Sequence, residues 1–504
     1  MIKNDGAMPV KTSPVYRWLW IGAIAVALAI RITFVFSTSP DDGDGVMYEQ
    51  LATNLRITGI YGMDLGQKLP TPLDVRVPGY PVFLAAVTRV FGGELLPQML
   101  VQAVVDVGTC LLAAVMAAWL VPLDWRKRAA LIAMWLAAVC PFLANYTAVA
   151  LTEVVATFWT ALALAALVAA CAGSEHFTWG RAGSSDGAME AAPRDRVRAL
   201  LSNRWFLGGL AVGIGTMVRP ETPLLLVALG ALLIWRWRRA ADWGKLARAG
   251  AFVIVGFVIP LIPWTARNAI TLHEFQPITG QYVLLPGEIP SRGFDAWTRT
   301  WLVHYRDVYM TAWNVGDQPL NISDLPPSAF DSDQERERVK ALYDEYDANC
   351  CDFTAEWDAQ FGVLARERAA RHPFRTYVKI PFERSFVLWF RPRVDLSQYS
   401  GEVWPPSEQI QEQGGEDFVV SLLLGATGIF YVVLASAGVA RAVARRNEWR
   451  PSRLWAIAFL VVFCVVRTVY FTRVTTPEPR YLLECYPPLF ALGAICFARP
   501  RKIA

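Results

Sequence analysis

The sequence lacks the patterns that mark several common classes of protein. Its eight cysteines include no Cys-x-x-Cys pair and no cysteine–histidine spacing, so it carries no zinc or redox motif. The first apolar run has no small-residue cleavage site, and we expect it to stay in place as a membrane anchor. No internal repeat is visible. For the adjacent Cys350 and Cys351 we expect two free thiols, or links elsewhere, in preference to a strained vicinal disulfide.

Apolar residues, by contrast, are abundant. The chain of 504 residues is 54% hydrophobic and 12% aromatic, with a mean hydropathy of +0.31, which is typical of a polytopic membrane protein. A helix of about 17–25 apolar residues can cross a bilayer. We therefore predict a mainly α fold with about ten membrane spans, at 16–37, 95–121, 127–145, 148–172, 205–219, 221–237, 248–265, 417–440, 452–472 and 480–498.

The basic residues orient these spans. Lysine and arginine in short loops favour the cytoplasmic side of a membrane. Ten alternating spans place on one side Lys3, Lys11, Arg17, Arg126, Lys127, Arg128, Arg194, Arg196, Arg198, Arg204, Arg236, Arg238, Arg239, Arg441, Arg445, Arg446, Arg499, Arg501 and Lys502. Both termini should then be cytoplasmic, in the plasma membrane or, for a bacterium with two membranes, the inner one.

This topology divides the chain into three parts. Residues 1–265 form an N-terminal membrane module of about seven helices, 266–416 an extracytoplasmic domain, and 417–504 a C-terminal membrane module of about three helices. Within the first module, 38–94 is a large outer loop and 173–204 a flexible cytoplasmic one. Met47, Leu51 and Leu55 recur with helical spacing, so we expect an amphipathic helix in the membrane interface, and a second juxtamembrane helix at 77–92.

Carboxylates mark the outer ends of two predicted spans. Asp41, Asp42 and Asp44 follow the first span, where they could cap the amphipathic helix or serve as a general base or metal ligand. Glu153 lies in the first turns of the fourth span. A helix N-terminus stabilises a carboxylate by about 0.3–1 kcal/mol, which is less than the cost of roughly 2.5–3.5 kcal/mol for a charge at the bilayer centre. Glu153 should therefore lie near the outer surface or have a partner.

Arginines gather on the same side, from segments far apart in the sequence. Arg219 could simply pair with Glu221, or its guanidinium fork could bind a lipid phosphate. Arg267 and Arg480 could be interfacial arginines that extend to the surface, or could likewise have a functional role, since arginine is disfavoured in short outer loops. Together these acids and arginines are the layout expected of a site for an anionic, lipid-linked substrate.

At these residues the chain resembles the C-type glycosyltransferases of the protein O-mannosyltransferase kind, a group that includes the transferase adding aminoarabinose to lipid A. The matching segments occur in the family's order along nearly the whole chain. They are Asp44 with Tyr48, Asn54-Leu55, Gly59-Ile60-Tyr61, RVPGYPVFLA (76–85), LTEV (151–154), VRPE (218–221), PWTARN (263–268), HPFRTYVK (372–379), LWFRPR (388–393) and PRYLLECYPP (479–488).

The resemblance implies an enzyme that transfers a hexose or pentose from a polyprenyl-phosphate donor to a protein, lipid or glycan hydroxyl on the extracytoplasmic face. It implies Asp44 as the base, by its spacing to Tyr48, and Glu153 as a second acid. We expect donor-phosphate binding by Arg219, Arg267 and Arg480, and a single, inverting displacement. The expected supporting residues are Asp41, Asp42, Tyr48, Arg76 and Tyr481.

Several alternatives remain open. No cofactor is implied, although the acids could together bind a divalent cation. The expected partners are the lipid-linked donor, the acceptor and membrane lipids, with no nucleic acid. A flippase or transporter would favour charges near mid-span and inverted repeats, neither of which is clear. A polymerase or ligase of lipid-linked saccharides also uses basic outer loops, but does not fit the RVPGYP and LTEV segments.

Overall fold

The computed structural model describes residues 14–37, 43–93, 95–173, 202–237, 243–280, 284–304, 307–316, 318–349, 351–391, 403 and 406–498. Asp41, Asp42, Cys350 and most of the predicted cytoplasmic loop at 173–204 lie outside these residues, as do both chain ends. Cys351 is a free thiol in the described part of the chain.

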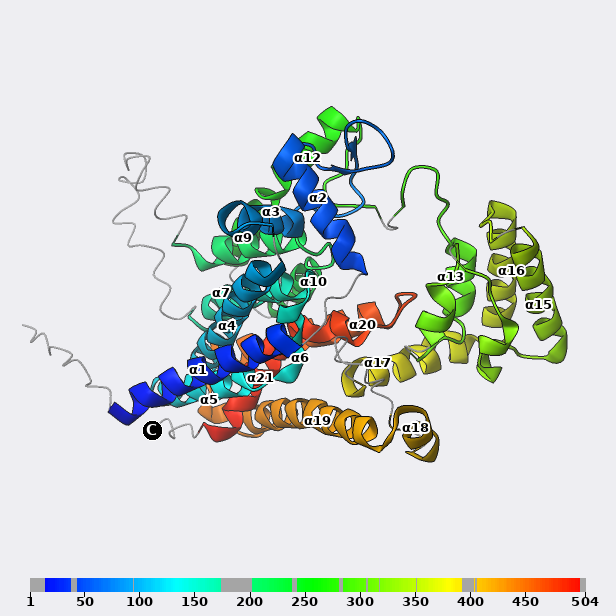
Figure 1. The fold of residues 1–504 in the computed structure, drawn as a ribbon. Helices are drawn as coiled ribbons and strands as arrows, with labels where there is room; N and C mark the ends of the chain where they lie inside the picture. The colour runs from blue at the N-terminus through cyan, green and yellow to red at the C-terminus, as the bar shows by residue number, and fades with distance from the viewer. Residues whose placement is uncertain are drawn as a thin grey trace, which may run out of the picture.

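Long apolar helices dominate the molecule (Figure 1). Five of the described helices are long and apolar enough to cross a membrane, and up to seven spans result if each of two bent helix pairs counts as one. This defines a mainly α, multi-pass membrane protein, while the count of ten spans stays a prediction. The five are α1 (Pro14–Ser37), α4 (Leu95–Leu120), α7 (Glu153–Ala172), α19 (Gly415–Ala444) and α20 (Pro451–Phe471).

The remaining predicted spans are short or broken helices. One bent pair joins Leu123–Ala138 to Pro141–Ala148 at 56°, and the other joins Trp243–Val258 to Leu261–Thr271 at 46°. Proline cannot continue a helix without losing a backbone hydrogen bond, which accounts for breaks at Pro141 and Pro260. The helices concerned are α5 (Arg126–Ala138), α6 (Pro141–Ala144), η2 (Asn145–Ala148), α9 (Arg204–Thr216), α10 (Leu224–Trp237), α11 (Trp243–Val258), α12 (Leu261–Thr271), η8 (Pro479–Cys485) and α21 (Tyr486–Ala494).

A buried arginine closes the first of these breaks. The Arg31 side chain on α1 is fully buried and donates hydrogen bonds to the carbonyls of Ala137 and Ala138, where α5 ends. Its Nε lies 2.7 Å from Asp106 Oδ2 on α4. The last carbonyls of a helix have no partner within the helix, and in a membrane no water replaces one. Arg31 therefore makes the bent segment compatible with its buried position.

The first outer loop folds against protein. It contains α2 (Asp44–Thr58) and α3 (Gly79–Phe91), joined through a small antiparallel pair, β1 (Gly62–Met63) and β2 (Thr71–Pro72). Both predicted helices are present. The apolar stripe of α2 packs on Trp264 of α12, with Leu51 fully buried. Helix α12 thus covers the apolar stripe, while the position of α2 in the membrane interface stays a prediction.

The outer segment has a core of its own. Helices α13 (Arg292–Thr298), α15 (Asp333–Ala348) and α16 (Ala355–Arg371) gather at one end of the molecule (Figure 1). Phe294, Trp297, Trp357 and Phe361 form its centre, with ring centroids 4.6–5.6 Å apart. Aromatic residues bury large apolar areas, so a few of them can stabilise a small domain. The predicted boundaries at 266 and 416 stay predictions.

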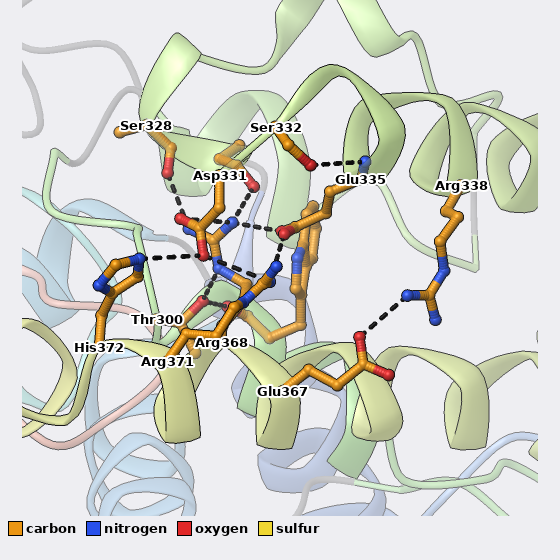
Figure 2. A network of polar contacts seen from close by, with 12 residues as sticks. Thr300, Ser328, Asp331, Ser332, Glu335, Arg338, Glu367, Arg368, Arg371 and His372 are labelled. Atoms are coloured by element: carbon orange, nitrogen blue, oxygen red, sulfur yellow. Dashed lines mark hydrogen bonds and ion pairs between the residues drawn. The ribbon is translucent and has the colours of Figure 1, made fainter.

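A buried ionic network holds the loop before α15 to the end of α16 (Figure 2). Arg368 is fully buried and contacts Glu335 and Asp331, while its Nε donates to Thr300. Arg375 pairs with Asp331 at 2.6 Å. Burial would raise the pKa of Asp331, but the hydrogen bond from Arg375 and the charge of Arg368 outweigh it and lower that pKa.

Helix α17 (Ile380–Phe390) follows this network and packs beside α19, α20 and η8. Helix α18 (Pro406–Gln413) precedes α19. Arg384 of α17 donates to the carbonyls of Leu302 and Val474. Trp389 donates to Thr468, near the end of α20. The outer segment is thereby fixed to the same end of α20 from which the chain continues to Arg480.

Candidate active site

Asp44 is the first residue of α2, and two arginines hold its carboxylate. Its Oδ1 lies 2.8 Å from Arg76 Nη2, and its Oδ2 lies 3.7 Å from Arg480 Nη2. The N-cap of α2 is Gly43, so Asp44 itself does not cap the helix. The side chain is 40% exposed. Asp44 thus presents an oriented carboxylate that an incoming molecule can reach.

Glu153 begins α7 and is almost completely buried. Its Oε1 accepts a hydrogen bond of 3.1 Å from Arg219 Nη1 and lies 3.8 Å from Arg480 Nη1. Its Oε2 has no hydrogen-bond partner among the residues that the structure describes. The buried glutamate therefore has the partner that its position requires, and one oxygen remains available.

Arg219 lies in the turn between α9 and α10. Its Nε lies 2.6 Å from Glu221, which is the pairing that the sequence allowed, and its Nη1 also contacts Glu153. The alternative role of Arg219 in binding a lipid phosphate stays a prediction. Its guanidinium also lies over the ring of Tyr481, 5.5 Å from the centroid. With 10% of its side chain exposed, Arg219 is a bridging residue on the inner side of the cluster.

Arg480, at the start of η8, connects the two predicted acids, since it contacts both Asp44 and Glu153. Its Nε lies 2.5 Å from Glu478, and the hydroxyl of Tyr481 donates to the other oxygen of Glu478 at 2.8 Å. The tertiary structure therefore brings Asp44 and Glu153, from two distant segments of the chain, to the guanidinium of Arg480.

Three charged residues of this cluster were missed from the sequence: Arg467, Glu478 and Glu484. Arg467 on α20 lies 2.6 Å from Glu484 and 3.8 Å from Glu221, and both Arg467 and Glu484 are 1% exposed. An ionisable residue inside a predicted span is costly and tends to be functional or paired. Arg467 in the span predicted at 452–472 and Glu484 in the span predicted at 480–498 carried that signal, whereas Glu478 lies between the two spans.

Aromatic residues pack next to the start of α2, which carries Asp44. The ring of Tyr48 lies 5.5 Å from the guanidinium of Arg76 and packs edge-on against Tyr80 at 5.2 Å. Burial raises the pKa of Tyr48, although Arg76 opposes the shift. Tyr48 is therefore a neutral packing residue at physiological pH, which keeps the start of α2 against α3.

Arg267 lies apart from this cluster. Its guanidinium donates to the carbonyls of Tyr61 and Leu73 at 2.6 and 3.0 Å and lies over the rings of Tyr61 and Trp264. Tyr61 immediately precedes β1, and Leu73 immediately follows β2. The geometry is that of a brace for the first outer loop, and the predicted contact of Arg267 with donor phosphate stays a prediction.

The sequence left open whether Asp41, Asp42, Asp44 and Glu153 together bind a divalent cation. Among the described residues, no group of three or more His, Cys, Asp or Glu side chains could hold a metal ion, and Arg480 lies between Asp44 and Glu153. Asp41 and Asp42, the other predicted ligands, lie outside the described ranges. The reaction proposed for this site uses no metal.

Comparison with known proteins gives matches among solved structures only. No family model and no curated protein matches the sequence. The chain is similar to the archaeal oligosaccharyltransferase AglB from Archaeoglobus fulgidus, in complex with an inhibitory peptide and a dolichol-phosphate, with 12% identity and a TM-score of 0.47 over 95% of this chain and 50% of that one. It is also similar to ArnT from Cupriavidus metallidurans bound to undecaprenyl phosphate, with 12% identity and a TM-score of 0.38 over 95% and 77%.

The chain spans about half the length of the AglB chain. Both likenesses, at 12% identity, concern the overall fold alone. Fold alone does not define chemistry. The functional proposal therefore rests on the residues of the Asp44–Arg480–Glu153 cluster.

Proposed function

We propose that this protein is a membrane glycosyltransferase. It transfers a sugar from a polyprenyl-phosphate donor to a hydroxyl group on the extracytoplasmic face, where the positive-inside rule places the first outer loop. The observation that carries the proposal is the exposure of Asp44. Of the carboxylates paired with arginine in this cluster, Asp44 is 40% exposed, whereas Glu153, Glu221, Glu478 and Glu484 are 1–11% exposed.

Asp44 is the general base of the proposed reaction. An acceptor hydroxyl must lose its proton as it attacks the sugar, and a positioned base contributes typically about 10²–10⁴-fold to the rate. The two arginine contacts fix the direction of the carboxylate, so it needs no reorientation when the acceptor arrives. The proton passes from the acceptor hydroxyl to Asp44 while the bond from the anomeric carbon to the phosphate oxygen breaks.

The arginines stabilise the departing phosphate. Arg76 and Arg480 are 25% and 16% exposed and flank Asp44, so both can reach an anion on its open side. Fixed cations near a developing negative charge lower the barrier without reorganisation. Arg219 is more buried and acts through Glu153, which it holds against Arg480. We thus assign direct phosphate contact to Arg76 and Arg480, and a positioning role to Arg219.

Glu153 orients Arg480 in this scheme and does not attack the sugar. A retaining mechanism would need a second carboxylate close to the anomeric carbon. Glu153 is buried and already engaged by two guanidinium groups, which supports a single displacement with inversion.

The test is sugar transfer by the purified full chain. A panel of polyprenyl phosphates carrying radiolabelled hexoses or pentoses is incubated with the protein and a membrane extract as acceptor source, and both the released polyprenyl phosphate and the labelled product are measured. Asp44→Asn keeps the shape of the side chain and should lower kcat by at least about 100-fold. A flippase would move the label across the membrane without forming a new glycosidic bond.

Asp64→Asn is the matched control, because Asp64 is an exposed aspartate in the same loop that contacts Gln50 and Asn54. It should transfer sugar at the wild-type rate. If Asp44→Asn unfolds at the wild-type temperature and still transfers sugar normally, Asp44 is not the base.

A further inference from the structure

A cavity lies between α13 and α16 of the outer segment and the helices α17 and α20. It has a volume of about 880 Å³ and is enclosed by α13, α16, α17 and the end of α20. Its lining includes five arginines and one carboxylate. The arginines that line it are Arg292, Arg299, Arg366, Arg384 and Arg473.

Arg384 is the buried member of this set. Its side chain is 1% exposed, and among the described residues it donates to carbonyl oxygens only, those of Leu302, Thr472 and Val474. Its Nη2 has no hydrogen-bond partner among the described residues. Burial and then repulsion by Arg299 and Arg473 lower the pKa of Arg384 to about 9. A buried cation held by neutral groups and repelled by its neighbours is costly unless an anion compensates it.

The acids nearby do not supply that compensation. Asp358 is the one carboxylate among the described residues that line the cavity, and its two oxygens accept hydrogen bonds of 2.8–2.9 Å from the amides of Gly293 and Phe294. Asp295 is near Arg299 but lines a neighbouring space. Among the described residues, Arg384 therefore has no carboxylate beside it that compensates its charge.

An apolar groove opens from the same place. It has a volume of about 800 Å³ between α17, α19 and α20, and it shares Pro381, Thr472 and Arg473 with the basic cavity. Its α19 wall is formed by one helix face, which includes Val432 and Val443. Arg473 lies where the groove and the cavity meet, and its exposed guanidinium donates to the carbonyl of Tyr377.

We propose that the arginine-lined cavity binds the phosphate head group of a membrane lipid whose hydrocarbon chain occupies the adjoining groove. Guanidinium groups match phosphate oxygens in geometry and charge, and the volumes are those of ordinary ligand sites. This site uses none of the residues assigned to sugar transfer. It can therefore be tested by binding alone, whatever the outcome for the proposed reaction.

The experiment measures equilibrium binding to the purified full chain in neutral detergent. The probes are radiolabelled dioctanoyl phosphatidic acid, dioctanoylglycerol and inorganic phosphate. Phosphatidic acid should bind at least about tenfold more tightly than either of the others, because only it has both the chain and the charge. Arg473→Gln and Arg299→Gln should each weaken its binding about tenfold or more. Ala440→Phe, which fills the groove, should also weaken it.

Matched controls separate binding from folding. Arg338→Gln removes an exposed arginine of the outer segment that pairs with Glu367, and Ala437→Phe adds a ring to the exposed side of α19 outside the groove. Both should bind like the wild type. Equal binding of dioctanoylglycerol, equal binding of inorganic phosphate, or unchanged binding by Arg473→Gln and Arg299→Gln would each overturn the proposal. Arg384→Gln is left out because Arg384 also holds α17 to the end of α20.

Discussion

The backbone amide of Gly79 donates a hydrogen bond of 2.5 Å to the carbonyl of Met217. This contact fixes the first outer loop to the turn that carries Arg219. The next residue continues the link, since the hydroxyl of Tyr80 donates to Gln102, and Gln102 donates to the carbonyl of Val149 just before Glu153. The start of α3 thus links the first outer loop to the turn that carries Arg219 and, through Gln102, to the segment before Glu153.

The close approach at Gly79 predicts that Gly79→Ala is damaging. An added Cβ would overlap the carbonyl of Met217 and lie 2.9 Å from a methyl group of Val218. Overpacking of this kind typically costs about 1–3 kcal/mol. We expect a lower unfolding temperature in detergent and a reduced rate of sugar transfer. Gly93→Ala is the control, because the nearest atom to its added Cβ lies 3.9 Å away, and it should leave both quantities unchanged.

The Arg219 pairs predict unequal effects for the two partners. Arg219→Gln leaves Glu153 and Glu221 without their nearest cation, and breaking a buried ion pair in this way costs about 3–5 kcal/mol. Glu153→Gln should cost less, because Arg219 keeps Glu221. Thermal unfolding of both variants, with Glu367→Gln at an exposed pair as reference, measures the difference. Equal losses for Arg219→Gln and Glu153→Gln would contradict the bridging role.

The brace formed by Arg267 predicts a local effect. Arg267→Gln should speed hydrogen exchange of the backbone amides between Tyr61 and Leu73, because both carbonyl contacts are lost. The apparent affinity for the lipid-linked donor should stay close to that of the wild type. A large loss of donor affinity with normal exchange would instead support direct contact of Arg267 with the donor phosphate.

The ionic network of the outer segment predicts a dependence on acid. The pKa of Asp331 is lower in the folded protein than its ordinary value of 3.8, so the ionised form contributes stability above that value. This stability is lost as the pH falls through the lowered pKa. We expect the unfolding temperature of the full chain to decrease below about pH 4, and we expect Asp331→Asn to be less stable at pH 7 but less sensitive to acid. A decrease of the same size in Asp331→Asn would contradict this assignment.

The sequence predicted most of the architecture because hydrophobic length is a local property. Helices lie in every range proposed as a span, and α2 and α3 lie where the apolar pattern placed them. Pro141 and Pro260 mark the breaks in the local sequence, but the sequence could not show what stabilises a broken span. The bend before Pro141 is stable only because Arg31, more than 100 residues away in the sequence, supplies donors to the exposed carbonyls.

For the predicted site, too, the sequence indicated which charged residues to consider, and the packing of the helices decided which of them meet. Asp44, Glu153, Arg219 and Arg480 were selected as charges at the outer ends of spans, and they do form one connected set of ion pairs. Arg267 has the same local signal but contacts the carbonyls of the first outer loop. The set also includes three residues that were not selected from the sequence: Arg467, Glu478 and Glu484. The pairs of Arg467 with Glu221 and Glu484 depend on how α20 and η8 pack against the turn after α9.

The sequence by itself determined that this chain is a helical membrane protein and that acids and arginines lie next to its apolar runs, since apolar length and charge position follow from residue order. Only the tertiary structure decided which charges meet, which carboxylate remains exposed, and where a second group of arginines surrounds a cavity. The physical reason is range: a hydrophobic run acts along the chain, whereas an ion pair forms between whatever side chains the packed helices bring within about 4 Å.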